Sequence, residues 1–250
     1  MARSGGAVLE RVLEDVGGVN TFFAVGGVPH GEGWEQVTAL TGRERAAAEV
    51  GRVRAQLGAV SGLGADEVEW RVGASLFHQG LASRLISPVL AAGLCHGVGL
   101  RPDLFLFEPE RSGAWELRTA QLGAEPLSRD PLEVAAWLEQ TVVEGVLSGV
   151  EETLTGIGRV SPGLLRGNTG AALAGAARAL GGARRERRAG AEEVVRVLTG
   201  RRTLEGTGSH TGVDRAGLAV FRRTTCCLYY RLPGGGLCGD CALRRPPGAR

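Results

Sequence analysis

The stretch DPLEVAAWLEQTVVEGVLSGVEETL, from Asp130 to Leu154, decides the fold class. Asp130 can cap a helix, and Pro131 suits the first helical position because a backbone N–H there would have no helical partner. Apolar residues then recur at helical spacing near one face. They are Leu132, Val142, Val146, Val150 and Leu154. The stretch predicts a long helix with a buried face, and thus a predominantly helical protein.

Two helical regions are predicted on the N-terminal side, after a first amphipathic stretch from Ala7 to Val16. In TGRERAAAEVGRVRAQL (41–57), Thr41 can cap the helix and Glu44 can complete a capping box, with Gly58 as the stop. Residues 67–94 also favour helix, but they contain Gly73, Gly80 and Pro88. Since proline interrupts helical hydrogen bonding, two packed helices are expected there.

On the C-terminal side, Ser161 and Pro162 open another helix, expected to run to Leu180 and to end at Gly181 and Gly182. The exposed run RRERR (184–188) leads into a short helix, AEEVVRVLTG (191–200). Two short runs, LFLFEPE (104–110) and AWELRTAQL (114–122), predict antiparallel strands joined by a turn at 111–113. The expected fold class is α+β, predominantly helical, with a small antiparallel β element and a C-terminal cysteine-rich segment that binds a cluster.

The composition narrows the range of functions. Apolar residues make up 43% and charged residues 22% of the 250, as in ordinary globular proteins. All 29 basic residues are arginine, but a net charge of +2 is too small for a broad nucleic-acid surface, so no nucleic-acid partner is expected.

The first residues, MARSGGAVLERVLEDVGG, do not resemble a signal peptide, and a cytoplasmic location is expected. The longest apolar region, from Leu81 to Leu100, is interrupted by Arg84 and His96 and is not expected to span a membrane. Peripheral membrane contact stays open, as does the oligomeric state.

Four of the five cysteines lie in CCLYYRLPGGGLCGDC, from Cys226 to Cys241. In a chain with no secretory signal, such clustering is typical of metal binding. Residues 233–236, PGGG, can turn the chain back and bring the two cysteine pairs together. The loop GTGSHTG (206–212) is taken as the boundary between a mainly helical domain, 1–205, and a C-terminal segment, 206–250, packed on it.

The spacing leaves three kinds of site open. Structural zinc sites usually separate paired cysteines by two to four residues, whereas Cys226 and Cys227 are adjacent. A 2Fe–2S cluster has two irons and can accept adjacent thiolates, although ordinary ferredoxin motifs lack this start. Thiol redox chemistry leaves the convergence of four cysteines unexplained. The spacing favours the cluster, with zinc as the main alternative. Cys95, in the apolar context GLCHG, is expected to be a core residue rather than a ligand.

The CC-x10-C-x2-C ending, with LYYR after the first pair, resembles the FhuF-like ferric siderophore reductases. Looser similarity extends through LLRGNTGAALAGAARAL and SLFHQGLASRLISPVLA. The resemblance implies a 2Fe–2S cluster on Cys226, Cys227, Cys238 and Cys241, and one-electron reduction of a ferric, hydroxamate-type siderophore in the cytoplasm. It implies no catalytic acid, base or nucleophile. Electrons would come from a separate protein of the ferredoxin or flavin reductase type.

Two other functions remain open: an iron–sulfur sensor or siderophore-binding protein without turnover, and a zinc-stapled structural domain. For substrate contacts, His78 and Arg84 lie in a segment similar to the family, and Trp70 could supply a stacking surface. Packing is the alternative role for each. Asn168 is either a ligand-contacting amide or a packing residue. The amides of Gly235, Gly236 and Gly239 are candidate donors to cluster sulfurs.

Overall fold

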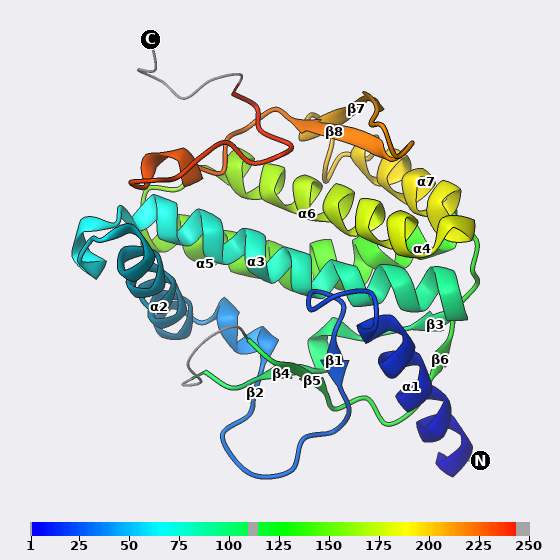
Figure 1. Ribbon diagram of the computed structural model, residues 1–250. Helices are drawn as coiled ribbons and strands as arrows, with labels where there is room; N and C mark the ends of the chain where they lie inside the picture. The colour runs from blue at the N-terminus through cyan, green and yellow to red at the C-terminus, as the bar shows by residue number, and fades with distance from the viewer. Residues whose placement is uncertain (1, 110–114, 244–250) are drawn as a thin grey trace.

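The computed structural model describes residues 2–109 and 115–243. Two long helices, α3 (Trp70–Ala91) and α6 (Pro162–Ala183), run side by side through the centre (Figure 1). Both are buried over most of their length. Small residues on α6 let its neighbours come close. This pair is the frame on which the other elements pack.

The other helices surround the central pair. They are α1 (Ala2–Gly17), α2 (Arg43–Ser61), α4 (Pro131–Leu138), α5 (Ser148–Ile157) and α7 (Arg188–Thr199). Short 3₁₀ segments are η1 (Val37–Thr41), η2 (Ala65–Glu67), η4 (Pro102–Leu104), η6 (Arg185–Arg187) and η7 (Tyr229–Arg231), and π-helical segments are η3 (Ala92–His96) and η5 (Glu139–Leu147). None of the helices in the described part of the chain is both long and apolar enough to cross a bilayer.

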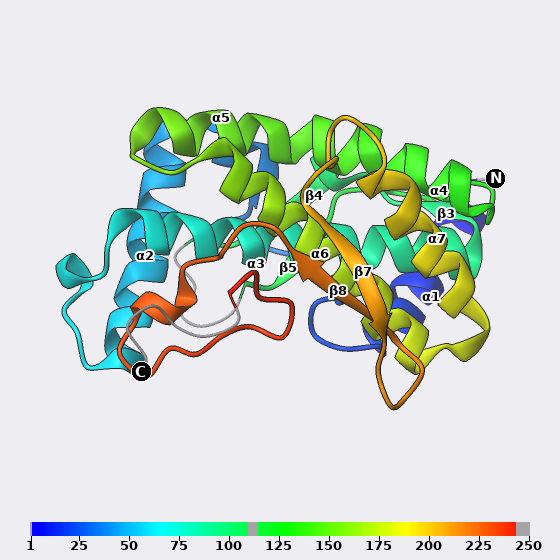
Figure 2. The same cartoon turned by 90° about the horizontal axis from the view of Figure 1, so that it is seen from above.

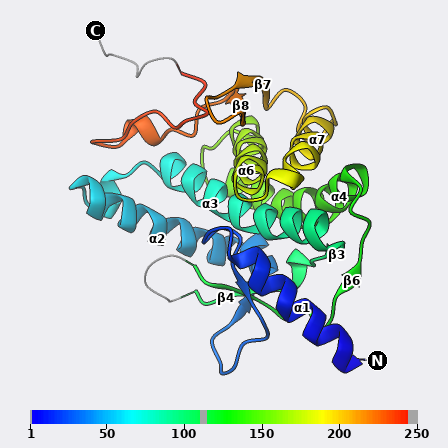
Figure 3. The ribbon, with the colours of Figure 1, turned by 45° about the vertical axis from the view of Figure 1, so that its right-hand side comes forward.

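The strands form three small sheets. They are β1 (Val25–Gly26), β2 (Glu35–Gln36), β3 (Val98–Gly99), β4 (Phe105–Phe107), β5 (Leu117–Thr119), β6 (Glu125–Pro126), β7 (Gly208–Val213) and β8 (Ala219–Arg223). The first sheet has the order β1-β5-β4-β2, and β3–β6 and β7–β8 form antiparallel pairs. Figure 3 shows the first sheet and α1 on one side of α3, and β7–β8 on the other. The α+β class with small sheets is therefore confirmed.

The stretch that predicted the helical class behaves as expected at its start. Asp130 Oδ1 accepts a hydrogen bond from the amide of Leu132 at 2.7 Å, which confirms the cap. Val142, Val146, Val150 and Leu154 are fully buried. The prediction for Leu132 is wrong, because its side chain is 53% exposed. The intervening π-helical segment, η5, has a wider turn, so a period of 3.6 residues does not carry across it.

The predicted break within residues 67–94 is wrong. A single helix, α3, continues through Gly73, Gly80 and Pro88. The hydroxyl of Ser87 donates to the carbonyl of Ser83 at 2.6 Å, in the turn where Pro88 crowds the backbone. Because almost every face of α3 is buried, packing outweighs the local cost of proline and glycine.

Other predicted helix ends also shift. Helix α2 begins after Gly42 rather than at Thr41, whose hydroxyl donates to the carbonyl of Thr38. It continues past Gly58 to Ser61 and is capped by Gly62, whose φ of +69° is easily adopted only by glycine. Helix α6 runs through both glycines after Leu180 to Ala183. The predicted cap at Thr41 and the predicted stops at Gly58, Gly181 and Gly182 are therefore wrong.

The β predictions have mixed outcomes. Strands β4 and β5 are antiparallel, as expected from their sequences, while the predicted turn at 111–113 lies outside the described residues. The expected loop at 206–212 is wrong in part, because residues 208–213 form β7 and pair with β8. The division into domains 1–205 and 206–250 stays a prediction.

Two glycines of α6 should respond in opposite ways to alanine. A Cβ at Gly167 would lie 1.9 Å from the hydroxyl of Thr225, just before the cysteines, whereas a Cβ at Gly175 would meet nothing within 4 Å. Gly167→Ala is therefore expected to lower the free energy of unfolding by about 1–3 kcal/mol through overpacking. Gly175→Ala should raise it by about 0.5–1 kcal/mol through helix propensity. Urea unfolding measures both, and equal effects would contradict the close approach at Gly167.

Candidate metal centre

The cysteine segment, residues 224–243, lies over α3 and α6 (Figure 2). Leu232 anchors it by packing with Val68, just before α3, and Val72, in the first turn of α3. The amide of Arg223 donates to the carbonyl of Asp240 at 3.0 Å, which joins the end of β8 to the loop between Cys238 and Cys241. The segment is thus held at both of its cysteine-bearing turns.

The four thiols meet as two pairs. Cys227 Sγ lies 3.8 Å from Cys238 Sγ, and Cys226 interacts with Cys241. All four are free thiols. A tetrahedral metal with sulfur bonds of about 2.3 Å holds two sulfurs about 3.8 Å apart. In residues 2–109 and 115–243, no group of three or more Cys, His, Asp or Glu side chains surrounds one point as a single ion requires. Each of the two thiol pairs could bind one iron of a 2Fe–2S cluster.

Backbone turns explain how adjacent cysteines can serve one site. Leu228 has a φ of +70°, so the chain bends sharply after Cys227. This bend lets the Leu228 amide donate to Cys226 Sγ at 3.4 Å. The same pattern recurs at Cys241, because the Leu243 amide donates to Cys241 Sγ at 3.4 Å. Such amides stabilise thiolate sulfur and tune a bound cluster.

These amide donors differ from those expected from the sequence. The Gly235 amide donates instead to the carbonyl of Leu232 at 2.8 Å. Neither Gly236 nor Gly239 donates to a sulfur among the described residues. The glycines shape the loop, and the residues two positions after a cysteine supply the hydrogen bonds.

The thiol pKa values reflect this crowding. Proton sharing with Cys238 lowers the pKa of Cys227 to about 6 and raises that of Cys238. The nearby positive charge of Arg223 also lowers the pKa of Cys227. Burial raises the pKa of Cys226, and the thiols of Cys227 and Cys241 add to the rise. One thiol of the Cys227–Cys238 pair is therefore ready to ionise, as metal binding requires.

A buried arginine lies behind the cysteines. Arg223 is 1% exposed and donates through its two terminal nitrogens to Asn168 Oδ1 and, at 3.3 Å, to Gln79 Oε1. Its Nε has no hydrogen-bond partner among the described groups. A buried cation with neutral partners is costly unless an anion lies close by. The thiolates of a bound cluster would supply that negative charge.

The same network holds the backbone of the cysteine turn. Asn168 Nδ2 donates to the carbonyl of Ser75 at 2.8 Å, and the Ser75 hydroxyl donates to the carbonyl of Cys227 at 2.8 Å. A continuous chain of hydrogen bonds thus runs from Arg223 through α6 and α3 to the cysteine backbone. Asn168 has this structural role, which sequence reasoning had left open.

The fifth cysteine lies elsewhere. Cys95 belongs to η3, half-buried against the main core, whereas the cysteine segment contacts α3 at Ser75. The helical residues between Ser75 and Cys95 span about 30 Å at 1.5 Å per residue, so Cys95 lies far from the four paired cysteines. Burial raises the pKa of Cys95, as expected of a packed thiol rather than a metal ligand.

The three residues predicted to contact substrate are not brought together on one surface. His78 is fully buried, with Nε2 3.4 Å from Glu151 Oε1, and so has no exposed surface for a ligand. Trp70 is half-buried with its ring against Gly158. Arg84 lies over the ring of Phe22, 5.6 Å from its centroid, and Phe22 lines a cavity described below. Substrate contact by these residues stays a prediction.

Residues 223–243 match a family model described as the FhuF 2Fe-2S C-terminal domain. The matched range holds all four paired cysteines and Arg223. No curated protein matches the chain. The paired thiols, the amide donors and the buried arginine all fit a 2Fe–2S cluster, in agreement with the similarity of this segment to the FhuF-type domain.

Proposed function

We propose that this protein is a ferric siderophore reductase that releases ferrous iron from a hydroxamate-type chelate. The observation that supports the proposal most directly is the FhuF-type domain with its two thiol pairs. The resemblance of upstream sequence to the same family supports it further. The 2Fe–2S cluster supplies single-electron transfer when bound.

The proposed reaction is a single electron transfer and needs few protein groups besides the cluster ligands. A reduced partner protein, of the ferredoxin or flavin reductase type, supplies one electron, and ferric iron in the chelate accepts it. No bond within the siderophore breaks, because its hard oxygen ligands hold ferrous iron much more weakly and release it. Outer-sphere transfer of one electron needs no acid, base or nucleophile. Reduction of an imported chelate belongs in the cytoplasm, where such donors are present.

The residues around the thiols have distinct roles in this proposal. Cys226, Cys227, Cys238 and Cys241 would hold the cluster. The amides of Leu228 and Leu243 would stabilise negative charge on the sulfurs of Cys226 and Cys241. Arg223 places a positive charge in the protein interior, where it favours the more negative, reduced state.

The test begins with protein purified without oxygen. We expect a red-brown protein that contains iron and sulfide and no stoichiometric zinc. After reduction and removal of the reductant, a ferric trihydroxamate should reoxidise the protein, and a ferrous-specific dye should trap about one ferrous ion per cluster, because such clusters carry one electron.

Other results would point to the alternatives. A colourless protein with about one zinc per chain would indicate a structural zinc domain. A coloured protein that stays reduced in the presence of ferric chelates would indicate a sensor or a binding protein. Either outcome would contradict the proposed function.

A further inference from the structure

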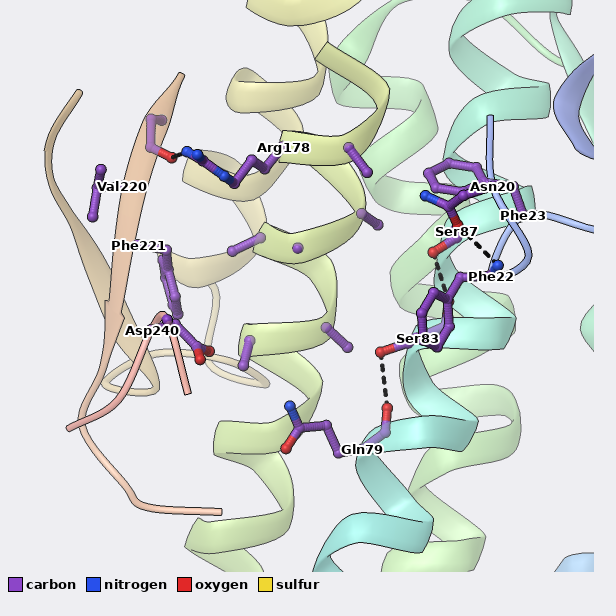
Figure 4. Close-up of a pocket in the computed structure, with 18 residues that line it drawn as sticks. Asn20, Phe22, Phe23, Gln79, Ser83, Ser87, Arg178, Val220, Phe221 and Asp240 are labelled. Carbon is purple, nitrogen blue, oxygen red and sulfur yellow. Dashed lines mark hydrogen bonds between the residues drawn. The ribbon is translucent and has the colours of Figure 1, made fainter. Parts of the chain in front are cut away.

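A cavity of about 570 Å³ opens beside the cysteine segment. Its walls come from α3, α6, β8 and the loop that carries Asn20, Phe22 and Phe23 (Figure 4). Gly239 and Asp240, the two residues between Cys238 and Cys241, also line it. The volume is in the range that binds small molecules.

The α6 wall is built from small residues, so the space remains open. Gly175 and several alanines line it, and an added Cβ at Gly175 would meet nothing within 4 Å. At the mouth, Phe22 is 45% exposed, and Arg84 lies against its ring. An exposed aromatic ring held in place by a cation offers a fixed apolar contact to a ligand.

The α3 side of the cavity is polar but uncharged. Figure 4 shows Gln79, Ser83 and Ser87 along this helix. The Ser83 hydroxyl donates to the carbonyl of Gln79 at 2.9 Å, and that of Ser87 donates to the carbonyl of Ser83, so both oxygens can still accept a hydrogen bond. Gln79 Oε1 already accepts from Arg223, which leaves its amide nitrogen to donate. This wall can contact a ligand that has both donors and acceptors.

Charge narrows the choice of ligand. Among the residues that the structure describes, the cavity lining has one cation, Arg178, which forms an ion pair with Asp214, and one anion, Asp240. Beside it, four thiolates and two sulfides would outweigh the charge of two ferric ions. A strongly anionic chelate would therefore be repelled, whereas a chelate whose ligand charges cancel that of the ferric ion would not.

We infer that this cavity is the binding site for a ferric chelate with little net charge, seated against the Cys238–Cys241 loop. The inference rests on the proposed function and adds where the substrate binds. A chelate in the cavity touches the loop that carries two of the four ligands, so the electron has only a short path to the iron. Arg84 then acts indirectly, by holding Phe22, and His78 supports α3 from within.

The inference is tested by binding rather than by turnover. The probe is the gallium(III) complex of a neutral trihydroxamate, which has the shape and charge of the ferric complex but cannot be reduced. We expect the cluster-loaded protein to bind it, and Gly175→Phe, which fills the cavity, to weaken binding about tenfold or more. A second variant, Ser83→Phe, should do the same from the α3 side. A gallium tricatecholate, which is strongly anionic, should bind much more weakly.

Gly156→Phe is the matched control. Gly156 also lies in a helix, and a Cβ there would also meet nothing within 4 Å, but it is on α5, away from the cavity. This variant should bind the probe as the unmodified protein does, and cluster absorption should be unchanged in all three variants. Unchanged binding by both cavity variants would overturn the cavity assignment, as would reduction of ferric chelates without any binding of the probe to this site. Failure of the unmodified protein to reduce ferric chelates would instead refute the proposed function.

Discussion

Cys227→Ser and Cys238→Ser are each expected to remove the visible absorption of the cluster and most of its iron. These two thiols lie 3.8 Å apart, as two ligands of one iron do. A serine hydroxyl does not ionise near neutral pH and is a harder ligand than a thiolate, so it replaces cysteine poorly at iron–sulfur sites. Absorption spectra and iron analysis of anaerobically purified variants measure the loss.

Cys95→Ser provides the matched control. It removes a thiol that is half-buried in η3 and does not take part in the thiol pairs. We expect it to retain full colour and iron content, with at most a small loss of thermal stability. Full retention of the cluster in Cys227→Ser or Cys238→Ser, or bleaching in Cys95→Ser, would show that the ligands are assigned wrongly.

Arg223→Met is expected to make the reduction potential of the cluster more negative. Arg223 is a buried positive charge, and reduction adds a negative charge to the site that it faces. Removing that attraction disfavours the reduced state. A unit charge nearby at an effective dielectric constant of about 20 contributes about 2 kcal/mol, or on the order of 0.1 V for one electron. Redox titration followed by absorption measures the shift.

Two further variants separate charge from simple disruption. Arg223→Lys loses the two-pronged contact with Asn168 and Gln79 but keeps the positive charge. Because the charge is kept, its reduction potential should stay close to that of the unmodified protein. Arg215→Gln removes an exposed charge from the turn between β7 and β8, where solvent screens it, and should change the potential little. An equal shift in Arg215→Gln and Arg223→Met would contradict the role of the buried charge.

Local sequence signals predicted much of the fold. The cap at Asp130, the buried face from Val142 to Leu154 and the antiparallel strands β4 and β5 all depend on neighbouring residues. Helix ends were harder to predict. Pro88 and Gly58 should end helices by their own preferences, but tertiary packing of α3 and α2 outweighs them. The π-helical segment η5 has no such simple pattern, so it also escaped prediction.

In the site, the ligands were evident from sequence but their surroundings were not. The hydrogen bonds from Asn168 to Ser75, and from Ser75 to Cys227, join residues far apart in the chain, and no local pattern indicates them. One signal was present for Arg223. In strand β8, alternation places Phe221 and Arg223 on the buried face and Arg222 on the exposed face. An arginine at an inward position, three residues before two cysteines, indicates a buried positive charge close to a negatively charged site.

The hydrogen-bond chain that fixes the Cys227 turn also bears on the speed of electron transfer. Ser75 and Asn168 lie on the two central helices and hold the backbone of this turn at a fixed position. A site whose dipoles are already in place has few atoms to rearrange when its charge changes. The reorganisation energy of the cluster should therefore be small. A low barrier of this kind would let the cluster accept an electron quickly from a transient donor and pass it quickly to a chelate bound in the cavity.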